Sequence, residues 1–174
     1  TGEGRLDSQS IGGKAISVMQ DLGTLARLTE SYNSTIKMTE AYLRQMQEME
    51  RYKLSDANMM LSYLNSMKKQ VELAIETAKK ILSTMGFTKA EKKNEIEDII
   101  DQMGASLAKM EKIMQIETQS TMMAEGMNEF MDFIDQEMSA EDFIEAKKPY
   151  GTASGAASGT LGVISLILGL LGIG

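Results

Sequence analysis

The sequence contains no histidine, no cysteine and no tryptophan, and its single proline is Pro149. These absences remove imidazole and thiolate metal ligands, the thiol nucleophile and every acid–base mechanism that uses histidine. Most classes of enzyme are excluded in this way, so we expect a non-enzymatic protein without a cofactor. The lack of cysteine does not indicate a cellular compartment, because cytosolic and bacterial envelope proteins can both dispense with it.

Aromatic residues are also scarce, with 4 Phe and 5 Tyr among 174 residues, whereas Met occurs 16 times. Flexible Met side chains suit helices that pack against one another, while strands favour aromatic and β-branched residues. Acidic residues outnumber basic ones by 25 to 18, and the basic residues are scattered among carboxylates. We therefore expect an all-α protein that does not bind nucleic acid directly, since phosphate binding needs a basic stripe.

Residues 1–13 are rich in Gly and are predicted to form a flexible arm that precedes a helical domain over residues 14–148. The chain begins with Thr1 instead of Met, which suggests that an upstream segment is removed. The first helix is predicted to extend to about Glu50. Its apolar stripe advances in steps of four and three residues through Val18, Leu22, Leu25, Thr29, Tyr32, Ile36, Thr39, Leu43 and Met46.

The second apolar stripe is the most regular in the sequence, and we expect Ser55 or Asp56 to cap its helix. Gly86 then follows as a left-handed C′ residue, and Thr88 to Glu91 reads as the capping box of a third helix. This short connection predicts an antiparallel helical hairpin. The helical seam of the second helix consists of Met60, Leu64, Met67, Val71, Ala74, Ala78, Ile81 and Met85.

The third stripe weakens near Glu117 and is followed by an apolar cluster at residues 130–138. A capping pattern at Ser139 predicts a brief additional helix that Pro149 ends. Heptads do not say whose helix is the partner, so the seams could pack within one chain or between copies. The third stripe consists of Ile96, Ile100, Met103, Leu107, Met110 and Met114.

Residues 149–174 form a Gly-rich hydrophobic tail, and Gly151–Gly174 contains no charged side chain. As a helix this stretch would reach about 36 Å, which exceeds a hydrocarbon core of about 30 Å. The spacing of Gly151, Gly155 and Gly159 lets helices approach closely and favours self-association in a membrane. The alternative is a flexible linker that leads to an apolar peg buried on another protein. The apolar residues of the tail are Leu161, Val163, Ile164, Leu166, Ile167, Leu168, Leu170, Leu171 and Ile173.

Two pairs of carboxylates have the i,i+3 spacing that places both on one helix face: Glu95 with Asp98, and Asp132 with Asp135. Such pairs could hold a divalent cation or act as an acid and a base. The same spacing is typical of any solvated helix face, and no phosphate loop or EF-hand pattern accompanies it. We therefore predict neither a metal site nor a catalytic site.

The order of elements over residues 18–138 resembles the minor pilus-tip subunits of bacterial type IV secretion and conjugation systems. The stretch Gly86-Phe87-Thr88-Lys89-Ala90-Glu91-Lys92-Lys93, followed by Ile96, Ile99 and Ile100, is similar to the turn and helix start of some conjugative members. The resemblance implies an exported, helical, oligomeric component that caps or seeds a pilus and contacts recipient cells. It assigns no role to an individual residue.

These features favour a structural, homo-oligomeric component of a bacterial envelope transport apparatus, which is exported or lies in the cell envelope. Its tail is expected to engage the lipid bilayer or membrane-protein subunits of the same apparatus. Two alternatives stay open. One is a helical pore-forming toxin or translocator that shelters its tail before insertion, and the other is a tail-anchored coiled-coil adaptor.

Overall fold

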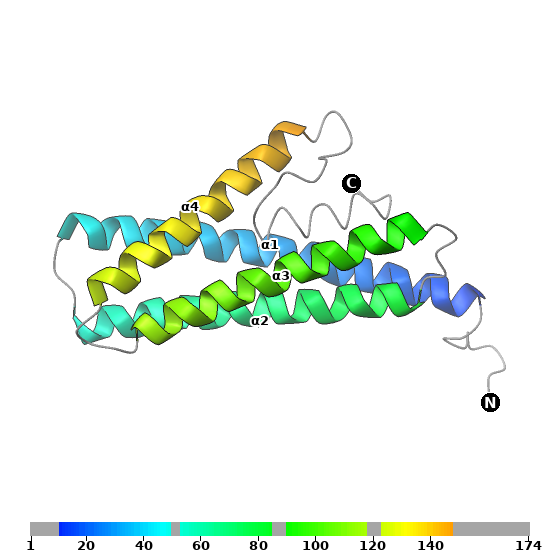
Figure 1. Cartoon of the computed structure of the whole chain (residues 1–174), viewed down its shortest axis with the longest axis horizontal. Helices are drawn as coiled ribbons and strands as arrows, with labels where there is room; N and C mark the ends of the chain where they lie inside the picture. The colour runs from blue at the N-terminus through cyan, green and yellow to red at the C-terminus, as the bar shows by residue number, and fades with distance from the viewer. Residues whose placement is uncertain (1–10, 50–52, 85–89, 118–122, 148–174) are drawn as a thin grey trace.

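The structure is a computed structural model that describes residues 11–49, 53–84, 90–117 and 123–147. These residues form four helices, α1 (Ile11–Met49), α2 (Leu54–Thr84), α3 (Ala90–Glu117) and α4 (Met123–Lys147). Successive helices run in opposite directions (Figure 1). The predicted all-α class and the antiparallel hairpin are confirmed.

The four helices pack in cyclic order around one apolar core. α2 packs extensively on α1 and on α3, while α4 contacts α3 and α1 less extensively, and the diagonal pairs barely touch. Every helix contributes to a continuous cluster of buried side chains. Among the largest of those that are almost completely buried are Tyr32, Leu25, Ile36, Leu43, Met60, Met103 and Phe130.

The helical seam of α2 lies inside this core. All seven of its described residues are buried within the single chain, while Met85 lies outside the described residues. The alternative in which the seams pack within one chain therefore accounts for the burial of this stripe. Its described residues are Met60, Leu64, Met67, Val71, Ala74, Ala78 and Ile81.

The two threonines in the stripe of α1 keep their hydroxyls satisfied inside the helix. Thr29 Oγ1 donates to the carbonyl of Leu25 at 2.8 Å, and Thr39 Oγ1 donates to the carbonyl of Thr35 at 2.7 Å. Because an unpaired buried hydroxyl is costly, this bond to the preceding turn explains how Thr39 can be completely buried.

The start of α2 differs from the predicted cap at Ser55 or Asp56. The helix begins at Leu54, and the Lys53 carbonyl accepts hydrogen bonds from the backbone N–H groups of Asp56 and Ala57. The Asp56 carboxylate accepts the Lys53 N–H at 2.9 Å. Lys53 thus occupies the N-cap, and Asp56 provides the reciprocal bond of a capping box from position N3.

Two further boundaries differ from the sequence-based expectation. α1 begins at Ile11, three residues before the predicted start, and residues 1–10 lie outside the described part. α4 continues through Ser139 to Lys147, so the prediction of a separate brief helix is wrong. The turns of α4 before Ser139 are already packed in the core, for example at Phe133 and Ile134. A local capping preference is then too weak to end the helix.

α4 packs on the bundle through its N-terminal part. Its described contributions to the core lie between Met127 and Met138, and the side chains of residues 140–147 are outside the described set. Figure 1 shows that its C-terminal end lies apart from the other three helices. All four helices therefore pack together at the end of the bundle that holds Met127 to Met138.

Candidate functional surfaces

Polar contacts at the two ends of the α1–α2 interface hold these helices in one register. Lys80 Nζ lies 3.4 Å from Asp21 Oδ1, and Tyr42 Oη donates to Asp56 Oδ1 at 3.0 Å. The Tyr42 ring also packs against Tyr63, with ring centroids 5.6 Å apart and planes tilted by 54°. Since a polar pair is lost when its helices slide, these contacts specify the antiparallel alignment.

A third polar contact lies between those two levels. Gln70 Nε2 donates to Ser31 Oγ at 2.9 Å and to Thr35 Oγ1 at 3.1 Å. The buried Gln70 Oε1 and Asp21 Oδ2 have no hydrogen-bond partner among the described residues. A buried oxygen without a hydrogen bond has lost its contact with water, which lowers the stability that its side chain contributes. We therefore infer that these contacts fix the alignment of α1 and α2 more than they add to the stability of the fold.

The Tyr42–Asp56 pair gives the protein a predicted alkaline sensitivity. Burial first, and then the hydrogen bond to Asp56 and its charge, raise the pKa of Tyr42 well above its ordinary value. A folded-state pKa above the unfolded value of about 10 stabilises the fold fully below that pH, and this contribution is lost as the pH rises through the folded value.

We therefore expect the thermal midpoint to fall at strongly alkaline pH, and to fall less steeply after Tyr42→Phe. At neutral pH the same variant should lose about 1 kcal/mol, the usual contribution of one hydrogen bond. Thermal melts followed by circular dichroism between pH 7 and pH 11 measure both effects. Equal alkaline slopes for the two proteins would contradict the assignment to Tyr42.

Ion pairs also connect the other helices on the outside of the bundle. Arg44 Nη2 lies 3.5 Å from Asp135 Oδ1 and joins α1 to α4, while Lys68 Nζ lies 3.6 Å from Glu111 Oε1 and joins α2 to α3. Because the side chains of these pairs are mostly exposed to solvent, the pairs contribute little stability. They identify which sides of the helices face each other.

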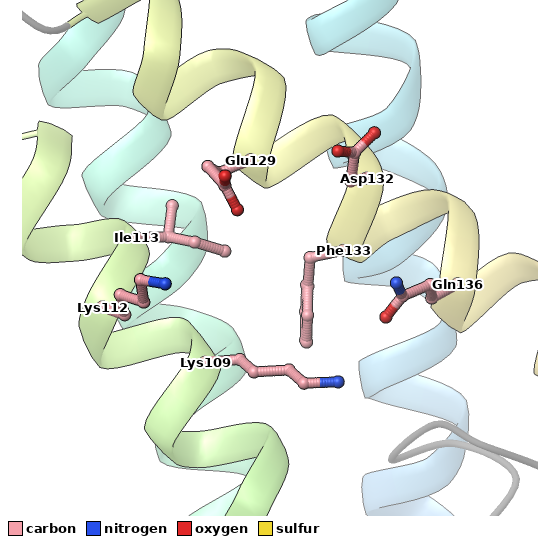
Figure 2. A pocket seen from close by; sticks show the side chains of 7 residues that line it. All are labelled: Lys109, Lys112, Ile113, Glu129, Asp132, Phe133 and Gln136. Atoms are coloured by element: carbon pink, nitrogen blue, oxygen red, sulfur yellow. The ribbon is translucent and has the colours of Figure 1, made fainter.

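A half-open pocket of about 200 Å³ lies between α3 and α4 (Figure 2). It is smaller than a typical ligand site, and its lining holds two lysines and two carboxylates whose charges cancel. No hydroxyl or thiol side chain accompanies these charged groups in the lining. It is lined by Lys109, Lys112, Ile113, Glu129, Asp132, Phe133 and Gln136.

The structure describes three of the four carboxylates that have the i,i+3 spacing. Asp98, Asp132 and Asp135 are exposed, and the side chain of Glu95 is outside the described set. Asp135 is engaged with Arg44. Within the four described helices, no group of three or more acidic side chains is placed to hold a metal ion.

The tail residues singled out by the sequence all lie outside the described residues. None of the described helices combines the length and the apolar character that a membrane crossing requires. The unplaced residues are Gly151, Gly155, Gly159, Leu161, Val163, Ile164, Leu166, Ile167, Leu168, Leu170, Leu171 and Ile173.

The structure also reveals apolar side chains on the outside of the helices, which heptad analysis did not select. Outer positions are polar in most helices, so an apolar residue there is a signal available in the sequence. The sequence does not show which of these outer apolar residues are covered by a neighbouring helix. The exposed ones are Ile16, Met19, Met38, Met49, Leu54, Met59 and Leu73.

Comparison of the chain with protein-family models, with curated proteins and with solved structures finds no match in any of the three.

Proposed function

We propose that the protein is a structural component of a bacterial envelope transport apparatus, similar in role to pilus-tip or conduit subunits of type IV secretion and conjugation systems. In this proposal the helical domain is a rigid module, and the tail Gly151–Gly174 engages a membrane. The tail also joins copies of the chain to one another. The protein acts by assembly and catalyses no reaction.

The observation that carries the proposal is the contrast between the two parts of the chain. The helical domain buries its stripes within itself and presents a charged exterior, whereas Gly151–Gly174 has no charge at all. An apolar segment of this length has to be covered by lipid or by protein. Because the seams are filled within one chain, we assign self-association to the Gly151, Gly155 and Gly159 spacing.

The described surfaces agree with a structural role. The polar contacts between α1 and α2 specify register, and the lining of the pocket between α3 and α4 carries balanced charges. A rigid hairpin of α1 and α2 provides a fixed spacer, about 45 Å long over the 31 residues of α2. The resemblance of residues 18–138 to pilus-tip subunits motivates the choice of transport apparatus.

The decisive experiment compares the full chain with a version that ends at Lys148. We expect the full chain to float with phosphatidylethanolamine–phosphatidylglycerol vesicles and to form a closed oligomer in mild detergent, as measured by light scattering. The truncated version should stay in the aqueous fraction as a folded monomer, because it retains all four helices. A monomeric full chain that does not float would refute the proposal.

A membrane-bound full chain that stays monomeric or dimeric would favour the two alternatives. One specific observation is compatible with the helical toxin or translocator, namely that the C-terminal end of α4 lies apart from the other three helices. Leakage of dye from vesicles distinguishes that protein from a tail-anchored adaptor, which would bind without releasing the contents.

A further inference from the structure

One side of the helical domain differs from its charged exterior. On this side, Gln70 of α2 bonds to Ser31 and Thr35 of α1, and Lys80 of α2 pairs with Asp21 of α1. Residues seven apart lie on the same side of a helix in a bundle, so steps of seven from these residues follow that side along both helices. We call the residues that these steps reach the α1–α2 face. They are residues 24, 28, 31, 35, 38, 42, 45 and 49 of α1 and residues 59, 63, 66, 70, 73 and 77 of α2.

The α1–α2 face contains no charged side chain. From residue 24 to residue 49 it extends about 38 Å along α1. The sides of the same two helices that meet α4 and α3 differ in this respect, because Arg44 pairs there with Asp135 and Lys68 pairs with Glu111. An uncharged surface of this length is therefore a particular property of one side of the α1–α2 pair.

Apolar side chains of this face remain in contact with water. Met38 is 56% exposed, Leu73 is 51% exposed and Met59 is 44% exposed. Met38 and Met59 each lie one turn before a tyrosine, and these tyrosines, Tyr42 and Tyr63, pack their rings together across the two helices. Tyrosine and methionine are enriched in protein–protein interfaces, whose cores are depleted of charge. The composition of the face thus indicates a surface that contacts protein.

A second copy of the chain fits this face on grounds of charge. The whole chain has a net charge of −7, so two copies that approach through charged sides repel each other. On the α1–α2 face, two copies bury no charge, and the rows immediately outside the face hold equal numbers of basic and acidic side chains. These outer residues are Arg27, Glu48, Lys69 and Glu76.

The size and composition of the face determine how strong this contact can be. Two helices, each about 10 Å across and about 38 Å long, offer roughly 700 Å² per copy, close to the about 800 Å² that each partner buries in a standard interface. Half of the residues on the face are Ser, Thr or Gln, whereas obligate interfaces are larger and more apolar. We therefore expect the contact between copies that are already held together, and not between dilute separate chains.

We propose that, in the oligomer that the tail assembles, neighbouring copies pack their α1–α2 faces against each other. The contact is isologous, because the same surface is used on both copies. This inference deepens the proposed function and rests on it, since association through the tail supplies the effective concentration, in the millimolar range, that a weak contact needs. Packing then removes Met38, Met59 and Leu73 from water.

The absence of cysteine allows a cross-linking test on the full chain. Met38→Cys places one thiol on the α1–α2 face. In the control variant, Met19→Cys places a thiol on α1 at a position outside the face that is even more exposed, at 71%. Each variant is assembled in mild detergent and treated with a short bis-maleimide, and a denaturing gel separates linked pairs from single chains. Circular dichroism verifies that both variants remain folded.

Contact through the face predicts about tenfold more linked pairs for Met38→Cys than for Met19→Cys, because the two thiols at Met38 are held close together. Equal yields would overturn the inference, since random encounters link any exposed thiol. A lower yield at Met38 would overturn it as well, because another segment would then cover the face.

A charge on the face provides a second measurement. Adding Leu73→Asp to the Met38→Cys chain brings two carboxylates into the contact, one from each copy, so the yield of linked pairs should fall several-fold. Adding Ala108→Asp instead places the same charge at an exposed position of α3 and should leave the yield unchanged. An undiminished yield with Leu73→Asp would contradict packing through this face.

Light scattering on the same samples separates this inference from the proposed function. An oligomer in which Met38→Cys and Met19→Cys link equally would preserve the proposed assembly through the tail and refute the contact between faces. A full chain that stays monomeric in detergent would refute both the assembly and the contact that depends on it.

Discussion

Replacing Val71 with Asp is expected to unfold the helical domain or to lower its thermal midpoint drastically. Val71 is completely buried in the core stripe of α2, between Met67 and Ala74. The substitution removes apolar burial and places a carboxylate in the core, at a combined cost of about 3 kcal/mol or more. Domains of this size have a total stability of only about 5–15 kcal/mol.

Leu73→Asp provides the matched control for this substitution. Leu73 lies two residues further along α2 and is exposed, so the same carboxylate remains hydrated there. Its thermal midpoint should stay close to that of the original protein, because surface substitutions usually change stability by about 0.5 kcal/mol or less. Thermal and urea denaturation followed by circular dichroism measure both variants. Equal midpoints for Val71→Asp and the original chain would show that α2 does not pack through its seam.

Introducing leucine at both Gly155 and Gly159 is expected to break the oligomer that the full chain forms in mild detergent. The hypothesis rests on the spacing of Gly151, Gly155 and Gly159, which lets two helix backbones approach closely in a membrane. Two leucine side chains on that stripe would hold the helices apart, so we expect the native mass from light scattering to fall to that of a monomer. Membrane binding should persist, because leucine raises the apolar character of the tail.

The control for this second experiment introduces the same two leucines elsewhere in the tail. Ala153 and Ala157 each precede a replaced glycine by two residues, and positions two apart point to different sides of a helix. Ala153→Leu with Ala157→Leu therefore matches the added hydrophobicity without blocking the glycine stripe. Loss of the oligomer in both double variants, or in neither, would eliminate glycine-mediated contact as the cause of assembly.

The helices could be predicted because their hydrophobic period is strong. Steps of three and four residues from Met60 to Ile81 identify one buried side of α2, and the structure buries every described member of that stripe. Caps were harder to predict. The structure caps α2 at Lys53, and it continues α4 through Ser139. Local capping preferences contribute about 1 kcal/mol, which packing of neighbouring turns can outweigh.

The candidate surfaces could be predicted only in part. The tail could be predicted because an uncharged end is visible in composition alone, whereas the exposed position of Met19 could not. In a heptad pattern Met19 is an ordinary outer residue. Its exposure is known only from the structure, because the apolar stripe does not specify which outer positions a neighbouring helix covers.

The sequence by itself determined the all-α class, the buried stripes and the abrupt change to an uncharged tail, because hydrophobic period and composition are local properties of the chain. Only the tertiary structure decided that the seam of α2 is filled from within the same chain. It also decided that the C-terminal end of α4 lies apart from the other three helices. Both outcomes depend on which helix sides meet in space, and a periodic pattern specifies a buried side without specifying its partner.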